Sequence, residues 1–196
     1  MNTNALLAAA RVPVDLLPWK SPDGLMNAKH ILGGAFLFNV CMAGLQRVDD
    51  EGYGGYTVMD DCAFEICRHF EAVYHAKGRV LKTGLGLGCF VRMCLTKPEI
   101  EHIDVVEIDP DIAEHFGRPF ADDPRVTIHV ADAFEFPLKG KYWDMVWHDI
   151  YEEGNEGLQL QHGKLIKRYA DHADLQGAWA FPKFLRRRMR ETGLGF

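Results

Sequence analysis

The sequence predicts an α/β fold: a doubly wound, mostly parallel, Rossmann-like sheet with helices on both faces, preceded by a small N-terminal β-hairpin. Strand-like and helix-like segments alternate from residue 61 onward, which is typical of parallel sheets with crossover helices. Four strand-like segments, near 79–83, 103–108, 126–131 and 143–149, lead into glycine or a carboxylate. Because the carboxyl ends of parallel strands share one edge of a sheet, these segments predict a nucleoside-binding crevice there.

The chain length suits one globular domain with a small appendage, since 47% of the 196 residues are apolar. We expect residues 1–60 to form a leader and the hairpin, and residues 61–196 to form the Rossmann-like domain. A short helix is expected at 2–10. The hairpin strands are expected at 35–42 and 56–59, around a glycine-rich turn. A mobile flap over the crevice is the alternative interpretation of this segment.

Composition and charge argue against several classes of protein. The formal charge of -6 gives no electrostatic reason to bind nucleic acid or an anionic membrane. The five cysteines form no zinc or disulfide pattern, so free thiols in a reducing cytosol are the simplest interpretation. No apolar run is long enough to span a bilayer, and no signal peptide is evident. We therefore expect a cytoplasmic protein without a membrane or nucleic-acid partner, and no metal.

The remaining elements follow from helical spacing and capping residues. Asp60 and Asp61 suit the first turn of a helix, and Gly78 suits its C-cap. Pro110 is a good first residue for a later helix. The other expected elements are a fifth strand at 178–181 and helices at 88–96, 110–116, 157–169 and 183–190. The last of these helices carries a basic run, which is typical of a solvated face.

Glycine occupies every second position of the loop after the first strand, at Gly84, Gly86 and Gly88. A loop without side chains lets a nucleoside approach the backbone closely, and the following helix offers unpaired N–H groups. The spacing is neither that of a dinucleotide-binding loop nor that of a P-loop. Glycines that serve only tight packing of the strand against the helix are the structural alternative.

Residues at the ends of the second and third strands extend this nucleoside site. Glu107 lies about twenty residues after the loop, where a carboxylate can bind both hydroxyls of a ribose. Ile108 would lay an apolar side chain on the purine. Asp132, followed by Ala133, is placed to accept a hydrogen bond from the adenine amino group. A solvated strand end for Glu107 and a helix N-cap for Asp132 are the structural alternatives.

Asp149 ends the fourth strand, next to the first strand where the strand order reverses. A carboxylate there lies beside the reactive end of a ligand, and it can hold an incoming amine or take up a proton. Tyr151, Glu152 and His148 lie alongside, although His148 is expected to point into the packing of the opposite face. Capping of the following loop is the structural alternative for Asp149.

These segments resemble the class I S-adenosylmethionine-dependent methyltransferase superfamily, and more narrowly its spermidine synthase-like branch. The resemblance rests on 80–88, on V-V-E-I-D-P at 105–110, on D-P-R-V at 123–126 and on the strand that ends at Asp132. It extends over residues 61–181. It implies the same Rossmann-like fold and S-adenosyl-L-methionine as the cofactor.

The resemblance also implies roles for single residues. The loop glycines would line the methionine and ribose portion of the cofactor, Glu107 would bind the ribose, and Asp132 would bind the adenine. Asp149 would correspond to the first acidic residue of the branch's gate loop, with Glu152 in the second acidic place.

The sequence departs from the family in four places. Lys82 stands where many methyltransferases have an acidic residue, and the stretch 60–65 lacks the Tyr and His that aminopropyltransferases carry. Glu153 replaces a proline of the gate loop. After Arg190 there is no visible counterpart of the antiparallel strand pair that closes the family's sheet. We therefore expect a shortened C-terminal end of the fold. The N-terminal hairpin could occupy the sheet edge that this pair would otherwise cover.

The favoured hypothesis is an S-adenosylmethionine-dependent methyltransferase that acts on a small molecule. The catalytic residues would be Asp149, Tyr151 and Glu152. A spermidine synthase-like aminopropyltransferase that uses decarboxylated S-adenosylmethionine and a cationic amine is the first alternative, because acidic residues follow the fourth strand. A nucleoside-binding Rossmann-like domain without turnover is the second. A homodimer is left open.

Overall fold

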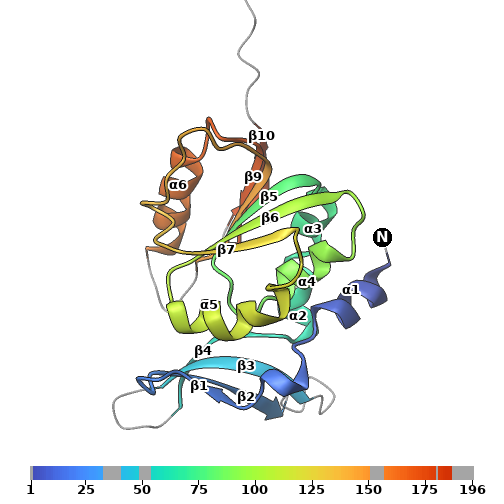
Figure 1. Cartoon of the computed structure of the whole chain (residues 1–196), viewed down its shortest axis with the longest axis vertical. Helices are drawn as coiled ribbons and strands as arrows, with labels where there is room; N and C mark the ends of the chain where they lie inside the picture. Colours follow the sequence, from blue (N-terminus) through green and yellow to red (C-terminus); the bar gives the residue numbers. More distant parts are fainter. Residues whose placement is uncertain (1, 33–40, 49–53, 151–156, 180, 187–196) are drawn as a thin grey trace, which may run out of the picture.

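The structure is a computed structural model that describes residues 2–32, 41–48, 54–150, 157–179 and 181–186. Its strands form two sheets, one of six strands and one of four. The four-stranded sheet lies below the other in Figure 1, at the carboxyl ends of the parallel strands of the larger sheet. The cavity described below lies between the two sheets.

The larger sheet has the strand order β10-β9-β8-β5-β6-β7. Its strands are β5 (Gly78–Thr83), β6 (Ile100–Glu107), β7 (Val126–Val130), β8 (Trp143–His148), β9 (Ala173–Ala178) and β10 (Phe181–Arg186). All of them pair in parallel except β10, which is antiparallel to β9. The predicted mostly parallel sheet is thus confirmed, and its order reverses between β5 and β8.

Successive residues of the central strands enter two different cores, because side chains of a strand alternate between the faces of the sheet. In β5, Val80 packs with one cluster and Leu81 with the other. The same alternation separates Val105 from Val106 in β6. Continuous apolar runs of this kind are typical of parallel strands that are buried on both faces.

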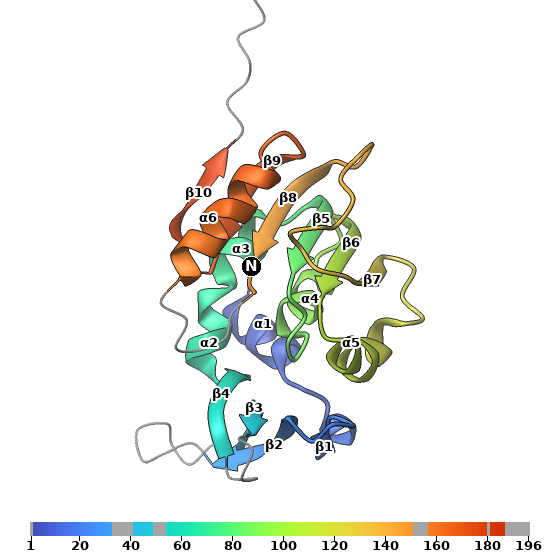
Figure 2. The same cartoon turned by 90° about the vertical axis from the view of Figure 1, so that its left-hand side faces the viewer.

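Helices cover both faces of the larger sheet, as predicted (Figure 2). One face carries α2 (Ala63–Arg68), α3 (Phe70–His75), α4 (Cys89–Leu95) and α5 (Pro110–Gly117), which is followed by the turn η3 (Arg118–Phe120). The opposite face carries α6 (Leu158–Arg168), which packs on β8 and β9. Pro110 is at the start of α5, where Asp109 caps the helix by accepting from the amides of Asp111 and Ile112.

Two parts of the prediction were wrong in detail. The helix expected from Asp60 to Gly78 is two short helices, which meet at the buried residue His69. Asp60 belongs to a strand, and Cys62 is the N-cap instead. The predicted strand at 178–181 and the first part of the predicted helix at 183–190 are replaced by β9 and β10.

The reason for the second error is tertiary pairing. Residues 181–186 pair with the open edge of β9, so their backbone hydrogen bonds come from a neighbour that local spacing does not reveal. Pro182 is tolerated because β10 is an edge strand, where one side of the backbone needs no partner. This strand, and not the N-terminal hairpin, occupies the sheet edge beyond β9. Residues 187–190 lie outside the described residues.

The predicted N-terminal hairpin is part of a four-stranded antiparallel sheet. Its strands are β1 (Trp19–Lys20), β2 (Met26–Leu32), β3 (Cys41–Val48) and β4 (Gly54–Asp60), paired in sequence order. The predicted strand at 56–59 lies within β4, whereas most of the strand predicted at 35–42 falls outside the described residues. Strand β2 was missed because the prolines of the leader suggested irregular structure.

The leader packs onto the large domain. It contains α1 (Thr3–Ala10), in agreement with the expected helix at 2–10, and the turn η1 (Val14–Leu16). Leu6 and Ala10 are buried, and α1 contacts α4. The division of the chain at residue 60 stays a prediction.

The buried side chain of Asp61 joins the leader to both parts of the chain. Its carboxylate accepts from the amides of Val12 (3.1 Å) and Ala43 (2.8 Å), and it forms an ion pair with Arg11 at 3.2 Å. Asp61 is therefore a junction between the leader, β3 and the start of α2.

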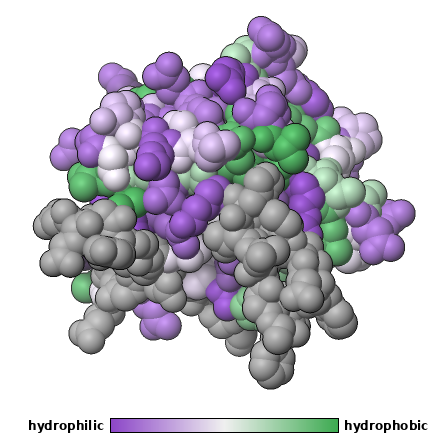
Figure 3. Space-filling view, turned by 90° about the horizontal axis from the view of Figure 1, so that it is seen from below, coloured by the Kyte–Doolittle hydropathy of each residue, from purple (hydrophilic) through white to green (hydrophobic). Residues whose placement is uncertain are grey.

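The surface seen from the side of the N-terminal sheet is mostly hydrophilic where residues are coloured, with a smaller apolar area (Figure 3). Among the described residues, no helix has the length and apolar character that a membrane span requires.

We predict that Asp61→Ala lowers the free energy of unfolding by about 2 kcal/mol or more, because two buried amides lose their acceptor. Urea denaturation measures this change. Asp122→Ala, at an exposed position, is the matched control and should have little effect. Equal destabilisation by the two substitutions would contradict the role of Asp61.

Candidate active site

A cavity of about 910 Å³ lies at the carboxyl ends of the parallel strands. Residues that follow β5, β6, β7 and β8 line one side of it, and residues of the N-terminal sheet and α2 line the other. The topology places this cavity where the strand order reverses, which is the usual ligand position in open α/β sheets.

The predicted glycine loop borders the cavity through Gly84 and Gly86. Gly84 has a φ of +81°, and a Cβ there would lie 2.1 Å from the backbone oxygen of Asp149. A Cβ on Gly86 would lie 2.5 Å from Sδ of Met59, a residue of β4. Gly84 therefore requires glycine, because a side chain would collide with the backbone. At Gly86 the positive φ of +54° favours glycine, whereas the Met59 side chain could shift.

Gly88 has a different environment from the first two glycines. It is the N-cap of α4, and a Cβ there would lie 3.0 Å from the ring of Phe120. Its φ of +76° also favours glycine. The structure thus gives Gly88 a clear packing role, and its contact with a cofactor stays a prediction.

Glu107 supports the glycine loop from the end of β6. Its Oε2 accepts from the amide of Leu85 at 2.6 Å, and its Oε1 accepts from the amide of Asp109 at 3.0 Å. The side chain is buried but lines the cavity. Since each carboxylate oxygen has two lone pairs, Glu107 can order the loop and still accept from a ligand hydroxyl.

Ile108, Asp132 and Ala133 also line the cavity. Ile108 is 67% exposed, so its apolar side chain is open to a ligand. Asp132 accepts from the amide of Phe134 at 2.7 Å, as expected for a residue that shapes the turn after β7. Ala133 is buried, and its carbonyl accepts from the hydroxyl of Tyr169. The cavity therefore brings together Glu107, Ile108, Asp132 and Ala133 with the first two loop glycines.

Asp149 forms a buried ion pair with Lys82 that the sequence analysis did not predict. Nζ of Lys82 lies 2.9 Å from Oδ2 of Asp149, and it also donates to the carbonyl of Gly84. Burial opposes ionisation of Asp149, but the Lys82 ammonium together with the nearby His69 and His162 outweighs it, so the pKa of this carboxyl is below its usual value. The lysine that departs from the methyltransferase pattern thus keeps Asp149 ionised.

His69 is a second neighbour of Asp149 that sequence reasoning missed. Its Nε2 lies 3.8 Å from Oδ2 of Asp149, and the ring packs edge-on against Phe90 and Trp147. Burial lowers the pKa of His69 to about 4, so the imidazole is neutral near pH 7. The signal available in the sequence was that His69 is a polar residue within the apolar stripe of the predicted helix.

His148 points away from the cavity, in agreement with the expectation. It is buried, and its ring nitrogens lie 3.3 Å from Oγ1 of Thr83 and 3.2 Å from Oε1 of Gln176. Burial lowers the pKa of His148 to about 3. Tyr151, Glu152 and Glu153, which the sequence placed in the gate loop, lie outside the described residues.

The cavity carries an excess of negative charge. Among the described residues, six carboxylates and three cationic side chains line it, together with the neutral His69. The carboxylates belong to Asp60, Glu65, Glu107, Asp109, Asp132 and Asp149, and the cations to Arg47, Arg68 and Lys82. Such a lining favours a cationic ligand, and both a sulfonium and an alkylammonium fit this description.

We predict that Lys82→Met lowers the free energy of unfolding by about 3 kcal/mol, because it leaves a buried carboxylate without its counter-ion. Chemical denaturation at pH 7 measures the loss. The exposed Lys139→Met is the control. Combining Lys82→Met with Asp149→Asn should restore part of the loss, and an additive effect of the two changes would argue against a paired interaction.

We also predict that stability decreases as the pH falls from 6.5 to 4. An unfolded imidazole has a pKa near 6.5, whereas burial lowers the pKa of His69 to about 4, so the unfolded state binds more protons in this window. His69→Gln should reduce the slope of the unfolding free energy against pH by about one proton. The partly exposed His75→Gln should not, and identical slopes for both variants would exclude a buried neutral His69.

No family profile matches the chain. The chain is 28% identical over 123 residues to a polyamine aminopropyltransferase of Prochlorococcus marinus, with 52% of this chain and 43% of that protein covered. It is 35% identical over 103 residues to a spermine synthase of Arabidopsis thaliana, with 47% and 29% covered. The chain therefore spans less than half the length of these relatives.

Solved structures of spermidine synthases share the fold. One, in complex with the transition-state analogue AdoDATO, has a TM-score of 0.56 and 18% identity over 82% of this chain and 56% of that chain. The Thermotoga maritima enzyme has a TM-score of 0.51 and 17% identity over 82% and 54%. These structures confirm the predicted fold. Together with the curated relatives, they agree with the resemblance to the spermidine synthase-like branch of the class I S-adenosylmethionine-dependent methyltransferase superfamily that the strand-end motifs indicate.

Proposed function

We propose that this chain transfers an aminopropyl group from decarboxylated S-adenosylmethionine to a primary amine. The observation that carries the proposal is the acidic lining of the cavity around Asp149, which suits both a sulfonium donor and a cationic acceptor. The names of the relatives, which are aminopropyltransferases and a spermine synthase, support this reaction over methyl transfer.

The nucleoside half of the donor fits the side of the cavity formed by β5, β6 and β7. Gly84 and Gly86 border the cavity at the loop, and Glu107 retains lone pairs for the ribose hydroxyls. Ile108 offers an apolar surface to the adenine, and Asp132 lies at the end of β7, within reach of the same ligand. These assignments follow from the position of each residue around one cavity.

The acceptor fits the side formed by β8 and α2. Asp149 is ionised because of Lys82, and among the described residues both of its close contacts are made by Oδ2. Oδ1 can therefore accept a hydrogen bond from the amine and orient the nitrogen lone pair. A carboxylate with a lowered pKa is a weak base, so we assign Asp149 to positioning and electrostatic attraction.

The reaction conserves charge and atoms. The acceptor nitrogen first releases its ammonium proton to water. Its lone pair then forms a new C–N bond with the aminopropyl carbon attached to sulfur, and the bond between that carbon and sulfur breaks. Its electron pair stays on sulfur, which changes from a sulfonium to the neutral thioether of methylthioadenosine. The sulfonium is already a good leaving group, so most of the acceleration would come from positioning.

Methyl transfer, which the sequence analysis favoured, is the second candidate. The glycine loop and Glu107 would serve S-adenosylmethionine equally well, since the two donors share the adenosyl-sulfonium group. The same cavity would then release S-adenosylhomocysteine in place of methylthioadenosine. Product identity and nucleoside preference separate the two reactions.

We predict that the purified chain releases methylthioadenosine from decarboxylated S-adenosylmethionine in the presence of a short diamine, as measured by chromatography. Methylthioadenosine should also raise the melting temperature more than S-adenosylhomocysteine. The opposite nucleoside preference, with S-adenosylhomocysteine as the product, would favour methyl transfer. Failure of both nucleosides to bind in calorimetry would leave a Rossmann-like domain without this activity.

Within the same assay, Asp149→Asn should lower kcat by about a hundredfold, because the neutral amide no longer attracts and orients the amine. Binding of methylthioadenosine should change little, since Asp149 is assigned to the acceptor. Asp122→Asn, at an exposed position, is the matched control and should keep the wild-type rate. Undiminished turnover by Asp149→Asn would remove this residue from the mechanism.

A further inference from the structure

The acceptor side of the cavity contains a cation that belongs to the protein itself. Arg68, the last residue of α2, lines the cavity and is 38% exposed. Arg68, Glu65 and Asp149 line the same cavity. The next residue along the chain, His69, lies 3.8 Å from Asp149, so the end of α2 is beside the proposed amine site. If one end of an elongated amine binds at Asp149, we expect its other end to extend toward Arg68.

Three groups hold the guanidinium of Arg68 in place. Its central carbon lies 4.4 Å from the ring centroid of Phe64 and 4.6 Å from that of Trp179. Its Nη1 lies 3.2 Å from Oε1 of Glu65. Phe64 and Glu65 come from α2, whereas Trp179 follows β9, so this cation site joins two elements that are distant in sequence.

A site with two aromatic faces and a carboxylate can bind an alkylammonium as well as a guanidinium. Arg68 is tethered one helical turn from Glu65, so it competes for the site at a high effective concentration. A free ammonium at the end of a long acceptor would therefore not displace it readily. That ammonium would also be repelled by the like charge of Arg68.

We propose that Arg68 fills the cation site of Phe64, Glu65 and Trp179 and thereby restricts the acceptor to short diamines, excluding longer polyamines with an additional ammonium. The inference deepens the proposed function and rests on it, since it concerns the amine acceptor of that reaction. It makes Arg68 a specificity-determining residue and gives it no part in bond formation.

The test is calorimetric binding of 1,4-diaminobutane and of a linear triamine to the full chain in the presence of methylthioadenosine. The wild type should bind the diamine about tenfold more tightly than the triamine. Arg68→Ala should remove this preference by strengthening triamine binding about tenfold. Arg68→Lys, which keeps a cation in the site, should retain the preference. Unchanged binding of methylthioadenosine by Arg68→Ala shows that this variant is folded.

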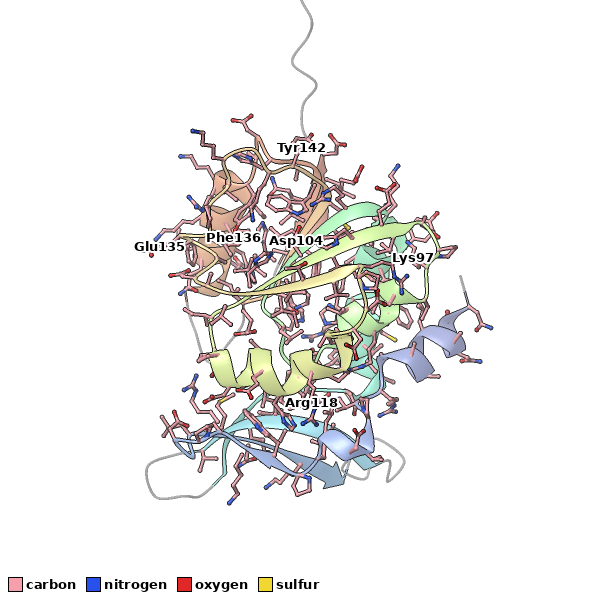
Figure 4. The ribbon with its side chains drawn as sticks, viewed as in Figure 1. Lys97, Asp104, Arg118, Glu135, Phe136 and Tyr142 are labelled. Carbon is pink, nitrogen blue, oxygen red and sulfur yellow. The ribbon has the colours of Figure 1, made fainter. Side chains whose placement is uncertain are left out.

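Arg118→Ala is the matched control, because Arg118 is exposed on η3, after α5 (Figure 4). A ratio of the two affinities that is the same in the wild type and in Arg68→Ala overturns the inference. So does the absence of amine binding in every variant. Failure of the proposed function is seen separately, as amine and nucleoside binding without turnover of decarboxylated S-adenosylmethionine by the wild type.

Discussion

The ion pair between Lys82 and Asp149 joins the two central strands of the larger sheet at the point where the strand order reverses. It lies where the end of β5 meets the end of β8. The backbone pairing of these strands also brings the carbonyl of Asp149 so close to Gly84 that a side chain there would collide with it. A buried pair of this kind costs desolvation free energy and adds little net stability by itself. Its effect is to fix one ionised carboxylate in the cavity, which contributes to the negative charge on that side of the cavity.

The larger sheet was predictable because its signals are local. Strands such as β5 and β6 are continuous apolar runs, and their ends carry glycine or acidic residues that folding brings to one edge. Glu107 and Asp132 could be assigned to one crevice for this reason. The elements that depend on distant partners were mistaken. Strand β10 was expected as a helix, since its pairing with β9 is invisible in local spacing.

The residues missed in the site share a physical reason. His69 and Arg68 lie in helical segments whose apolar spacing indicated a plain packing helix, and nothing in that pattern shows which strand end they will meet. Lys82 was noticed only as a departure from a family pattern. Its partner lies 67 residues away in the sequence, and the contact exists only because β5 and β8 are adjacent. The pairing with Lys82, which helps to lower the pKa of Asp149 against the opposing effect of burial, is a property of the folded sheet.

Polar groups buried within this sheet do not all belong to the cavity, and the difference is informative. Asp104, in the interior of the sheet (Figure 4), accepts from Nε1 of Trp143 at 2.8 Å and lies 2.8 Å from Nε2 of His129. Its pKa is also below the usual value, since these hydrogen bonds outweigh the opposing effect of burial. Yet Asp104 does not line the cavity, and its carboxylate has its hydrogen-bond partners within the sheet. Asp149 differs because it faces a space that can admit a cation, and that combination of ionisation and access distinguishes a candidate functional carboxylate from a structural one.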